Sequence, residues 1–167
     1  MKVGILTFHR AHNYGANLQC FALQEVLRNL GHEVAIINYK QAFIDKVYAP
    51  RLDLKDCLRK IYYRRFRFLY IDIINYFKEI RRWFYFYLFR RRYLICTKVC
   101  NSDSIPQAFE RYIIGSDQVW SLHCTNVYDP VFWGDFKRPN ISKLLGYAIS
   151  SNGDYKQFLT PEQIVNI

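Results

Sequence analysis

The sequence predicts an α/β fold in which helices flank a parallel β-sheet. Short apolar runs that suit buried strands occur at residues 3–8, 32–39, 112–114 and 144–150. A segment with helical periodicity separates the first two runs. The composition, with 51% hydrophobic and 23% charged residues, is that of a globular chain rather than a disordered one. At 167 residues, the chain has room for one domain with a full core or for one half of a larger enzyme.

The first forty residues carry a β-α-β pattern. Residues 3–8 are mostly apolar and lead into a polar, glycine-bearing loop, as expected for a strand that is buried on both faces. Between residues 17 and 30, apolar side chains recur at helical spacing, and Gly31 supplies the left-handed position that ends such a helix. The run at residues 32–39 then predicts a second strand, parallel to the first across a right-handed crossover.

A basic and aromatic helical module follows at about residues 52–95. Its apolar residues track one helical stripe, no Gly or Pro interrupts them up to residue 92, and Arg residues occupy the other faces. We expect a long helix or a helical hairpin that is inserted into the α/β domain.

This module has three interpretations: a helix packed on its own domain with solvated arginines, a nucleic-acid surface, or a helix on a membrane surface. No nucleic-acid motif accompanies it, so we expect no nucleic-acid partner. Arg81, Arg82, the aromatic run at residues 83–89 and the Arg cluster at residues 90–92 resemble an interfacial helix, although seven apolar residues cannot span a bilayer. Packing on the domain is the favoured interpretation, and peripheral membrane contact comes second.

In the second half of the chain, two predicted strands end in small polar residues. We expect a short helix at residues 105–111, a third strand at residues 112–114 and a fourth at residues 144–150. Ligands of open parallel sheets bind beyond the carboxyl ends of the strands. In a parallel sheet, the first predicted strand ends at this same edge. The third strand ends at Gly115, Ser116 and Asp117, and the fourth ends at residues 151–153 (Ser-Asn-Gly), so we predict a candidate site at this edge.

The loop after the first strand supplies the other candidates, Asn13 and Gly15. A turn into a helix leaves free N–H groups, and a glycine at positive φ can shape that turn around a phosphate or carboxylate. Side chains nearby could add charge-assisted bonds: His9, Arg10 and His12. The alternative is that Gly15 serves the turn alone. Both interpretations stay open, since the full dinucleotide fingerprint is absent.

Residues 115–120 also have two interpretations. Asp117 could orient a hydroxyl or a histidine, and Trp120 could stack on a sugar ring. Alternatively, Ser116 and Asp117 cap a turn while Trp120 packs in the core. From the residues alone, the second interpretation is preferred.

The charge and the cysteines bear on partners and compartment. The chain has 24 Lys and Arg against 14 Asp and Glu, a net charge of +10, which favours an anionic partner without choosing among phosphate, nucleic acid and a membrane face. Five irregularly spaced cysteines and the lack of a secretion signal favour reduced thiols in the cytoplasm. Their spacing fits no strong zinc pattern, so we predict no metal site.

The last residues predict that a further helix begins. Residues 160–163 have a capping-box pattern with Pro at the first helical position, and the chain stops one turn later. A helix of about one or two turns is not stable alone. We therefore expect the natural fold to continue, and the chain to be a truncated product or a fragment.

Three sequence blocks occur in order along the chain: residues 12–23 (HNYGANLQCFAL), 115–120 (GSDQVW) and 146–150 (GYAIS). Together they resemble the polysaccharide pyruvyl transferase family, and the second block is the most specific. Residues 89–97 and 129–133 also resemble connecting segments of that family. The resemblance covers most of the chain outside the basic module.

The resemblance implies a two-domain enzyme similar to type B glycosyltransferases, which moves a pyruvyl group from phosphoenolpyruvate onto hydroxyls of a cell-surface glycan as a ketal. Residues 1–167 would be its single N-terminal Rossmann-like domain, without the C-terminal domain. The family's catalytic Arg and His lie largely in that second domain, so the resemblance assigns no catalytic residue here. It implies a substrate-binding role in the cleft for Asn13, Gly15, Gly115, Ser116, Asp117 and Ser150.

Partners follow from the same resemblance. They are phosphoenolpyruvate as donor substrate, with no cofactor, and a glycan or lipid-linked glycan as acceptor, in the cytoplasm or at the inner face of the membrane. Some family members have an acidic residue where Ala16 stands, which leaves the acceptor open. Two alternatives remain: a non-catalytic module that binds a membrane surface or a polyanion, and a sugar-nucleotide glycosyltransferase.

Overall fold

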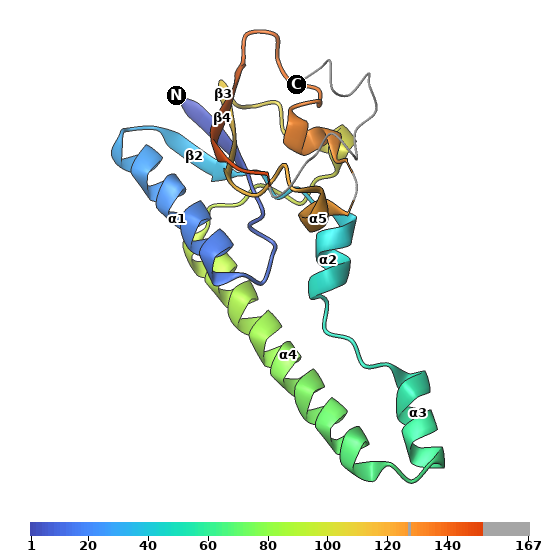
Figure 1. The fold of residues 1–167 in the computed structure, drawn as a ribbon. Helices are drawn as coiled ribbons and strands as arrows, with labels where there is room; N and C mark the ends of the chain where they lie inside the picture. Colours follow the sequence, from blue (N-terminus) through green and yellow to red (C-terminus); the bar gives the residue numbers. More distant parts are fainter. Residues whose placement is uncertain (127, 152–167) are drawn as a thin grey trace.

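The computed structural model describes residues 1–126 and 128–151, and it contains one sheet of four parallel strands with flanking helices (Figure 1). The strand order is β2-β1-β3-β4. The α/β, Rossmann-like prediction is therefore confirmed, and each strand lies close to its expected position. The strands are β1 (Lys2–Leu6), β2 (Glu33–Ile36), β3 (Arg111–Asp117) and β4 (Lys143–Ile149).

An extended segment lengthens the sheet beyond β2. Parallel bridges join Ile36 to Cys96 and Tyr39 to Cys100. The backbone N–H of Ile36 donates to the carbonyl of Ile95 at 2.7 Å, and that of Thr97 donates to the carbonyl of Ile36 at 2.9 Å. Residues 95–100, which follow the long helix, therefore lie along the outer edge of β2.

Helix α1 (Tyr14–Asn29) starts earlier than the apolar periodicity predicts. Asn13 is its N-cap, and the Asn13 side chain accepts a hydrogen bond from the N–H of Ala16 at 3.2 Å. The predicted tight turn is therefore the first turn of this helix. Gly15 is helical and is not among the positive-φ residues, so the expected positive φ at Gly15 is wrong. Gly31, at φ +82°, ends the helix as predicted.

Strands β1, β2 and β3 are largely buried on both faces, as their apolar runs predict, whereas the edge strand β4 is mostly exposed. On β3, Ile113 contributes to one core cluster, while Tyr112 and Ile114 contribute to the other. The first cluster packs the sheet against α1 through Cys20 and Leu23. The second cluster includes Leu6, Phe8, Ile37, Ile44, Val131 and Phe132.

The remaining helices are short except for α4. They are α2 (Ala42–Tyr48), α3 (Leu54–Tyr62), α4 (Phe66–Tyr93), α5 (Leu122–Thr125) and the 3₁₀ turns Ser102–Ser104 and Pro130–Trp133. The helix predicted at residues 105–111 is absent. Pro106 disfavours helical backbone at Ile105, which has φ −56° and ψ 127°, and Arg111 already opens β3.

Helices α3 and α4 form a helical hairpin, one of the two structures predicted for this segment. They lead away from the sheet (Figure 1). Arg64, at φ +51°, makes the turn between them without Gly or Pro. We call α3 and the first half of α4, residues 54–80, the helical arm. Only the last turns of α4 pack on the domain, where Phe86 is buried and Phe89 contacts Phe21. The favoured interpretation of a module packed on its own domain is therefore wrong for the arm.

Among the helices of the described residues, none combines the length and the apolarity needed to cross a lipid bilayer.

Candidate functional site

A polar pocket of about 590 Å³ lies beyond β1 and β2. It is enclosed by the loop after β1, by α2, by the end of α4 and by the segment after α4. This is the carboxyl edge of the sheet, where the topology predicts a ligand site. Its polar lining includes His9, Arg10, His12, Asn38, Asp45 and Arg90.

Two side chains, one from α1 and one from α4, fix the loop that forms the pocket wall. Asn17 is buried in α1, and its Nδ2 donates to the carbonyls of Ala11 at 2.7 Å and Asn13 at 3.0 Å. From α4, Arg82 Nη2 donates to the carbonyl of His12 at 2.8 Å. The loop is therefore tied to both helices.

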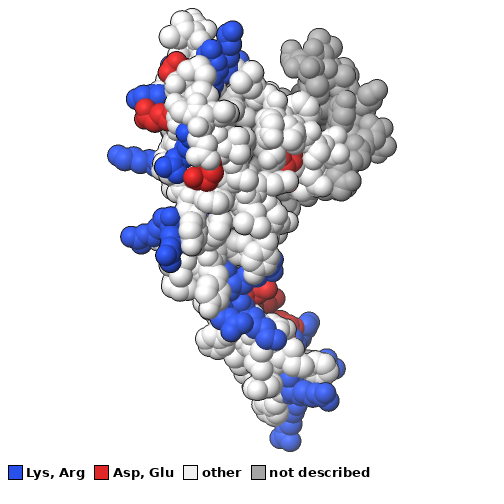
Figure 2. All heavy atoms as spheres, turned by 90° about the vertical axis from the view of Figure 1, so that its left-hand side faces the viewer, with Lys and Arg blue, Asp and Glu red and all other residues white. Residues whose placement is uncertain are grey.

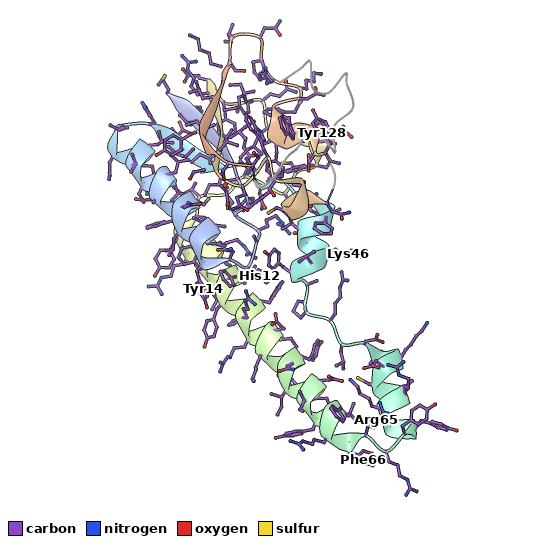
Figure 3. All side chains as sticks on the ribbon, in the orientation of Figure 1. His12, Tyr14, Lys46, Arg65, Phe66 and Tyr128 are labelled. Carbon is purple, nitrogen blue, oxygen red and sulfur yellow. The ribbon has the colours of Figure 1, made fainter. Side chains whose placement is uncertain are left out.

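His12 lies between α2 and α4 (Figure 3). Its ring stacks on Phe86 of α4 with 5.3 Å between centroids and lies 5.2 Å from the ring of Tyr48 of α2. Burial, followed by the charges of Arg90 and Arg82, lowers the pKa of His12 to about 4. The imidazole is therefore neutral near pH 7, and a bound anion would favour its protonation.

Arg10 is already neutralised within the pocket wall by an ion pair with Asp45. Its Nε and Nη2 donate to the two carboxylate oxygens of Asp45 at 2.7 and 2.9 Å, and its Nη1 donates to Asn38 Oδ1 at 3.0 Å. Asp45 comes from α2, which is capped by the Gln41 side chain accepting from the N–H of Ile44. This bidentate pair neutralises the charge of Arg10, and the contacts to Asp45 and Asn38 occupy three of its five N–H donors.

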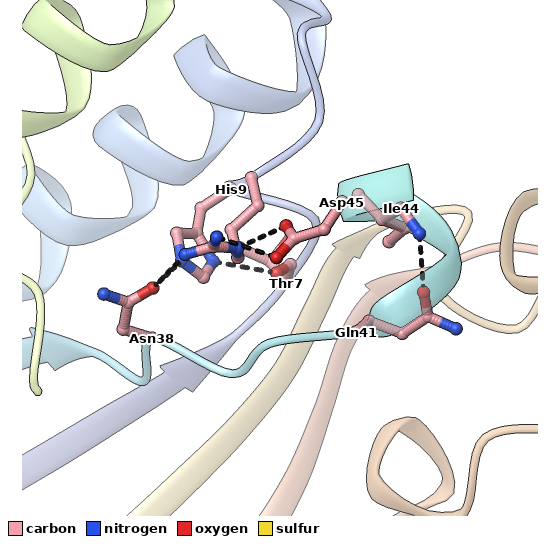
Figure 4. Close-up of polar contacts among 7 residues, drawn as sticks. Thr7, His9, Asn38, Gln41, Ile44 and Asp45 are labelled. Carbon is pink, nitrogen blue, oxygen red and sulfur yellow. Dashed lines mark hydrogen bonds and ion pairs between the residues drawn. The ribbon is translucent and has the colours of Figure 1, made fainter. Parts of the chain in front are cut away.

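His9 is buried beside the Arg10 and Asp45 pair (Figure 4). Its Nδ1 lies 3.2 Å from the carbonyl of Thr7, and its Nε2 lies 3.1 Å from Asn38 Oδ1. Both contacts favour the protonated ring, but burial outweighs them and lowers the pKa of His9 to about 4. His9 is therefore a neutral structural residue of the wall near pH 7.

Arg90 is a pocket cation for which the described residues provide no ion pair. Its Nη1 is buried without a hydrogen-bond partner among the described residues. Burial, followed by the charge of Arg10, lowers the pKa of Arg90, and the opposing effect of Asp45, which pairs with Arg10, does not cancel this shift. Arg91 lines the same pocket. A buried cationic donor without an acceptor is unfavourable, and an oxygen of a phosphate or carboxylate would satisfy it.

The structure brings four predicted residues together at the ends of β3 and β4. The N–H of Ser150 donates to the carbonyl of Asp117 at 3.1 Å. Thr7 Oγ1 donates to the carbonyl of Ser116 at 3.5 Å, which links the end of β1 to the same place. Gly115 precedes Ser116 on β3. The expectation that three strand ends meet at one edge is confirmed.

Geometry gives some of these residues clear structural roles. Gly115 has φ +108°, and a Cβ there would lie 2.1 Å from the carbonyl oxygen of Tyr147, so only glycine permits the close approach of β4. Asp117 Oδ1 accepts from the N–H of Gln118 at 2.8 Å, and burial raises the pKa of Asp117. Trp120 packs in the core, where its Nε1 donates to the carbonyl of Phe132 at 2.9 Å.

None of the six predicted residues lines the 590 Å³ pocket. Asn13 and Gly15 sit exposed on the first turn of α1, while the other four lie along the neighbouring strand ends. Their substrate-binding role stays a prediction. The pocket residues that sequence reasoning missed, Asn38 and Asp45, carry no motif, and Arg90 was visible only as one of a run of three arginines.

Within residues 1–126 and 128–151, no group of three or more His, Cys, Asp or Glu side chains is placed to hold a metal ion. The free cysteines include Cys20, Cys57 and Cys100, which are buried.

A scan of the sequence against protein-family models gave no match, and searches of curated proteins and of solved structures gave no significant match.

Proposed function

We propose that this chain is part of an enzyme that resembles polysaccharide pyruvyl transferases and transfers a pyruvyl group from phosphoenolpyruvate to hydroxyls of a cell-surface glycan. The observation that carries the proposal is the buried Nη1 of Arg90, which has no hydrogen-bond partner among the described residues and lies in a pocket with excess positive charge at the carboxyl edge of the sheet. The three ordered sequence blocks support the choice of reaction.

The donor suits this pocket in size and charge. Phosphoenolpyruvate carries a phosphate and a carboxylate, and both accept paired hydrogen bonds from guanidinium groups. Arg90 and Arg91 supply these donors, while Arg10 stays bound to Asp45. A volume of about 590 Å³ lies within the range of about 300–1,000 Å³ that small-molecule sites occupy.

The reaction breaks the bond between the enol carbon and the phosphate oxygen. Two sugar hydroxyl oxygens bond to that carbon, one hydroxyl proton ends on the neighbouring CH₂ to make a methyl group, and the other leaves with phosphate. We assign the acceptor side to the row of polar groups at the ends of β3 and β4. Ser116, Asp117 and Ser150 would hold the hydroxyls there, and proton transfer is assigned to none of them.

The test is a transfer assay. The protein is incubated with phosphoenolpyruvate and lipid-linked or polymeric bacterial glycans, phosphate release is followed, and the ketal is identified by mass spectrometry. We expect phosphate release that depends on the glycan. Asp117→Asn should raise the KM for the glycan about tenfold, since hydrogen bonds to a charged group are worth about 1.5–3 kcal/mol. The matched control is Asp135→Asn, on an exposed residue outside both sites, and should leave KM unchanged.

A parallel assay supplies sugar nucleotides instead of phosphoenolpyruvate. Glycosyl transfer from a sugar nucleotide, with no ketal from phosphoenolpyruvate, would overturn the proposal in favour of a glycosyltransferase of the same architecture.

A further inference from the structure

An exposed apolar stripe runs along α4 from Phe66 to Leu88. Its residues occur at i, i+4, i+7, i+11, i+18 and i+22, counted from Phe66, which is the spacing of a single helical face. Their exposed fractions run from 38% at Ile73 to 66% at Tyr70. The stripe residues are Phe66, Tyr70, Ile73, Phe77, Phe84 and Leu88.

Other faces of α4 make the contacts with the rest of the protein. Phe86 is buried against the ring of His12, and Phe89 contacts Phe21 of α1. Near the far end of the arm, Asp72 pairs with Lys60 of α3. Figure 3 places Phe66 at that end, well away from the sheet. The stripe is therefore free of the domain over the described residues.

The charges beside the stripe all have one sign. At about 100° per residue, Arg81 and Arg92 border the stripe, and each is exposed. The two acidic residues of α4 lie on the opposite half of the helix, where Asp72 pairs with Lys60 and Glu79 pairs with Arg82. In Figure 2, Lys and Arg are spread along the molecule and over its projecting lower part, with uncharged side chains between them.

We propose that the stripe docks α4 flat on the surface of an anionic lipid bilayer. Its aromatic side chains would enter the interfacial layer, and the bordering arginines would contact anionic headgroups. The helix of 28 residues is about 42 Å long, so it can lie along the surface over its whole length. This inference goes beyond the proposed function and does not depend on it.

Charge complementarity selects this occupant over a second copy of the chain. Two stripes packed face to face would bring the same bordering arginines together, and the net charge of +10 would add to the repulsion. A bilayer that contains phosphatidylglycerol presents the opposite charge, and Phe, Tyr and Arg suit the boundary between headgroups and acyl chains.

The experiment is co-sedimentation of the full chain with vesicles. One set contains phosphatidylcholine alone, and the other contains phosphatidylcholine with phosphatidylglycerol. We expect binding to the anionic vesicles that weakens as salt is raised, and little binding to the neutral vesicles. Inorganic phosphate at matched ionic strength should not compete, because the stripe recognises a lipid surface rather than a free anion.

Two variants of one residue type make the test specific. Phe77→Ser removes a stripe residue that is 63% exposed, and it should lower vesicle affinity about tenfold. Phe68→Ser is the matched control: Phe68 is 57% exposed on the same helix, but nine residues away and hence on the opposite face. It should leave affinity within about twofold of the parent. Circular dichroism checks that both variants stay folded.

Three results would overturn the proposal: equal binding to neutral vesicles, equal losses in the two variants, or no vesicle binding at all. A dimer that Phe77→Ser converts to a monomer, without vesicle binding, would instead assign the stripe to a second copy.

Discussion

His9 shows how burial of one residue makes the fold sensitive to pH. Its pKa is lowered from 6.5 to about 4, chiefly by burial. Between these values the unfolded chain binds a proton that the folded chain does not, so the free energy of unfolding falls as pH falls from about 6.5 to about 4. Near pH 5, this difference in proton binding at His9 lowers the free energy of unfolding by roughly 2 kcal/mol.

His9→Gln removes this titration. Urea unfolding at several pH values should therefore show a shallower loss of stability towards pH 5 in the variant than in the parent. Identical slopes in the two proteins would contradict the assignment of a neutral, buried His9.

At the scale of elements, Gln24 holds the end of α4 on the domain. The side chain is fully buried in α1, its Nε2 donates to the carbonyl of Tyr93 at 2.9 Å, and its Oε1 accepts from the N–H of Ile95 at 2.7 Å. These two bonds secure the point where α4 passes into the edge segment beside β2. The position of Arg90 in the pocket depends on that junction.

Gln24→Leu keeps the size of the side chain but leaves both backbone groups without their partner. We expect the free energy of unfolding to fall by about 1–3 kcal/mol in urea titrations. Gln19→Leu, on an exposed residue of the same helix, is the control and should change stability by less than about 0.5 kcal/mol. Equal losses in the two variants would show that Gln24 does not secure the junction.

The sequence predicts these elements well where periodicity and local chemistry agree. Strands β1, β2 and β3 have apolar runs that are largely buried on both faces, and Gly31 ends α1 as expected. The sequence fails at residues 105–111, where Pro106 and the pairing of β3 override a weak helical pattern. It also cannot tell that the arm projects, because an apolar stripe has the same spacing whether a core or another surface covers it.

At the scale of the whole molecule, the sequence predicts the edge of the sheet that carries the site better than it predicts the pocket. Topology alone requires the ends of β1, β3 and β4 to meet, and they do. The pocket unites Arg10, Asn38, Asp45 and Arg90 from segments far apart in the chain. Which of these cations has a carboxylate partner depends on packing, and no pattern in the sequence records that.

The central claim is that Arg90, whose Nη1 has no hydrogen-bond partner among the described residues, binds a donor that carries a phosphate and a carboxylate. Isothermal titration calorimetry of phosphoenolpyruvate into the protein tests it most directly, with Arg90→Gln compared with Arg92→Gln, whose side chain does not line the pocket. We predict binding by the parent, a loss of about tenfold or more in Arg90→Gln because a charge-assisted hydrogen bond is worth about 1.5–3 kcal/mol, and no change in Arg92→Gln. Absence of binding by the parent, or equal affinities in the two variants, would contradict the account.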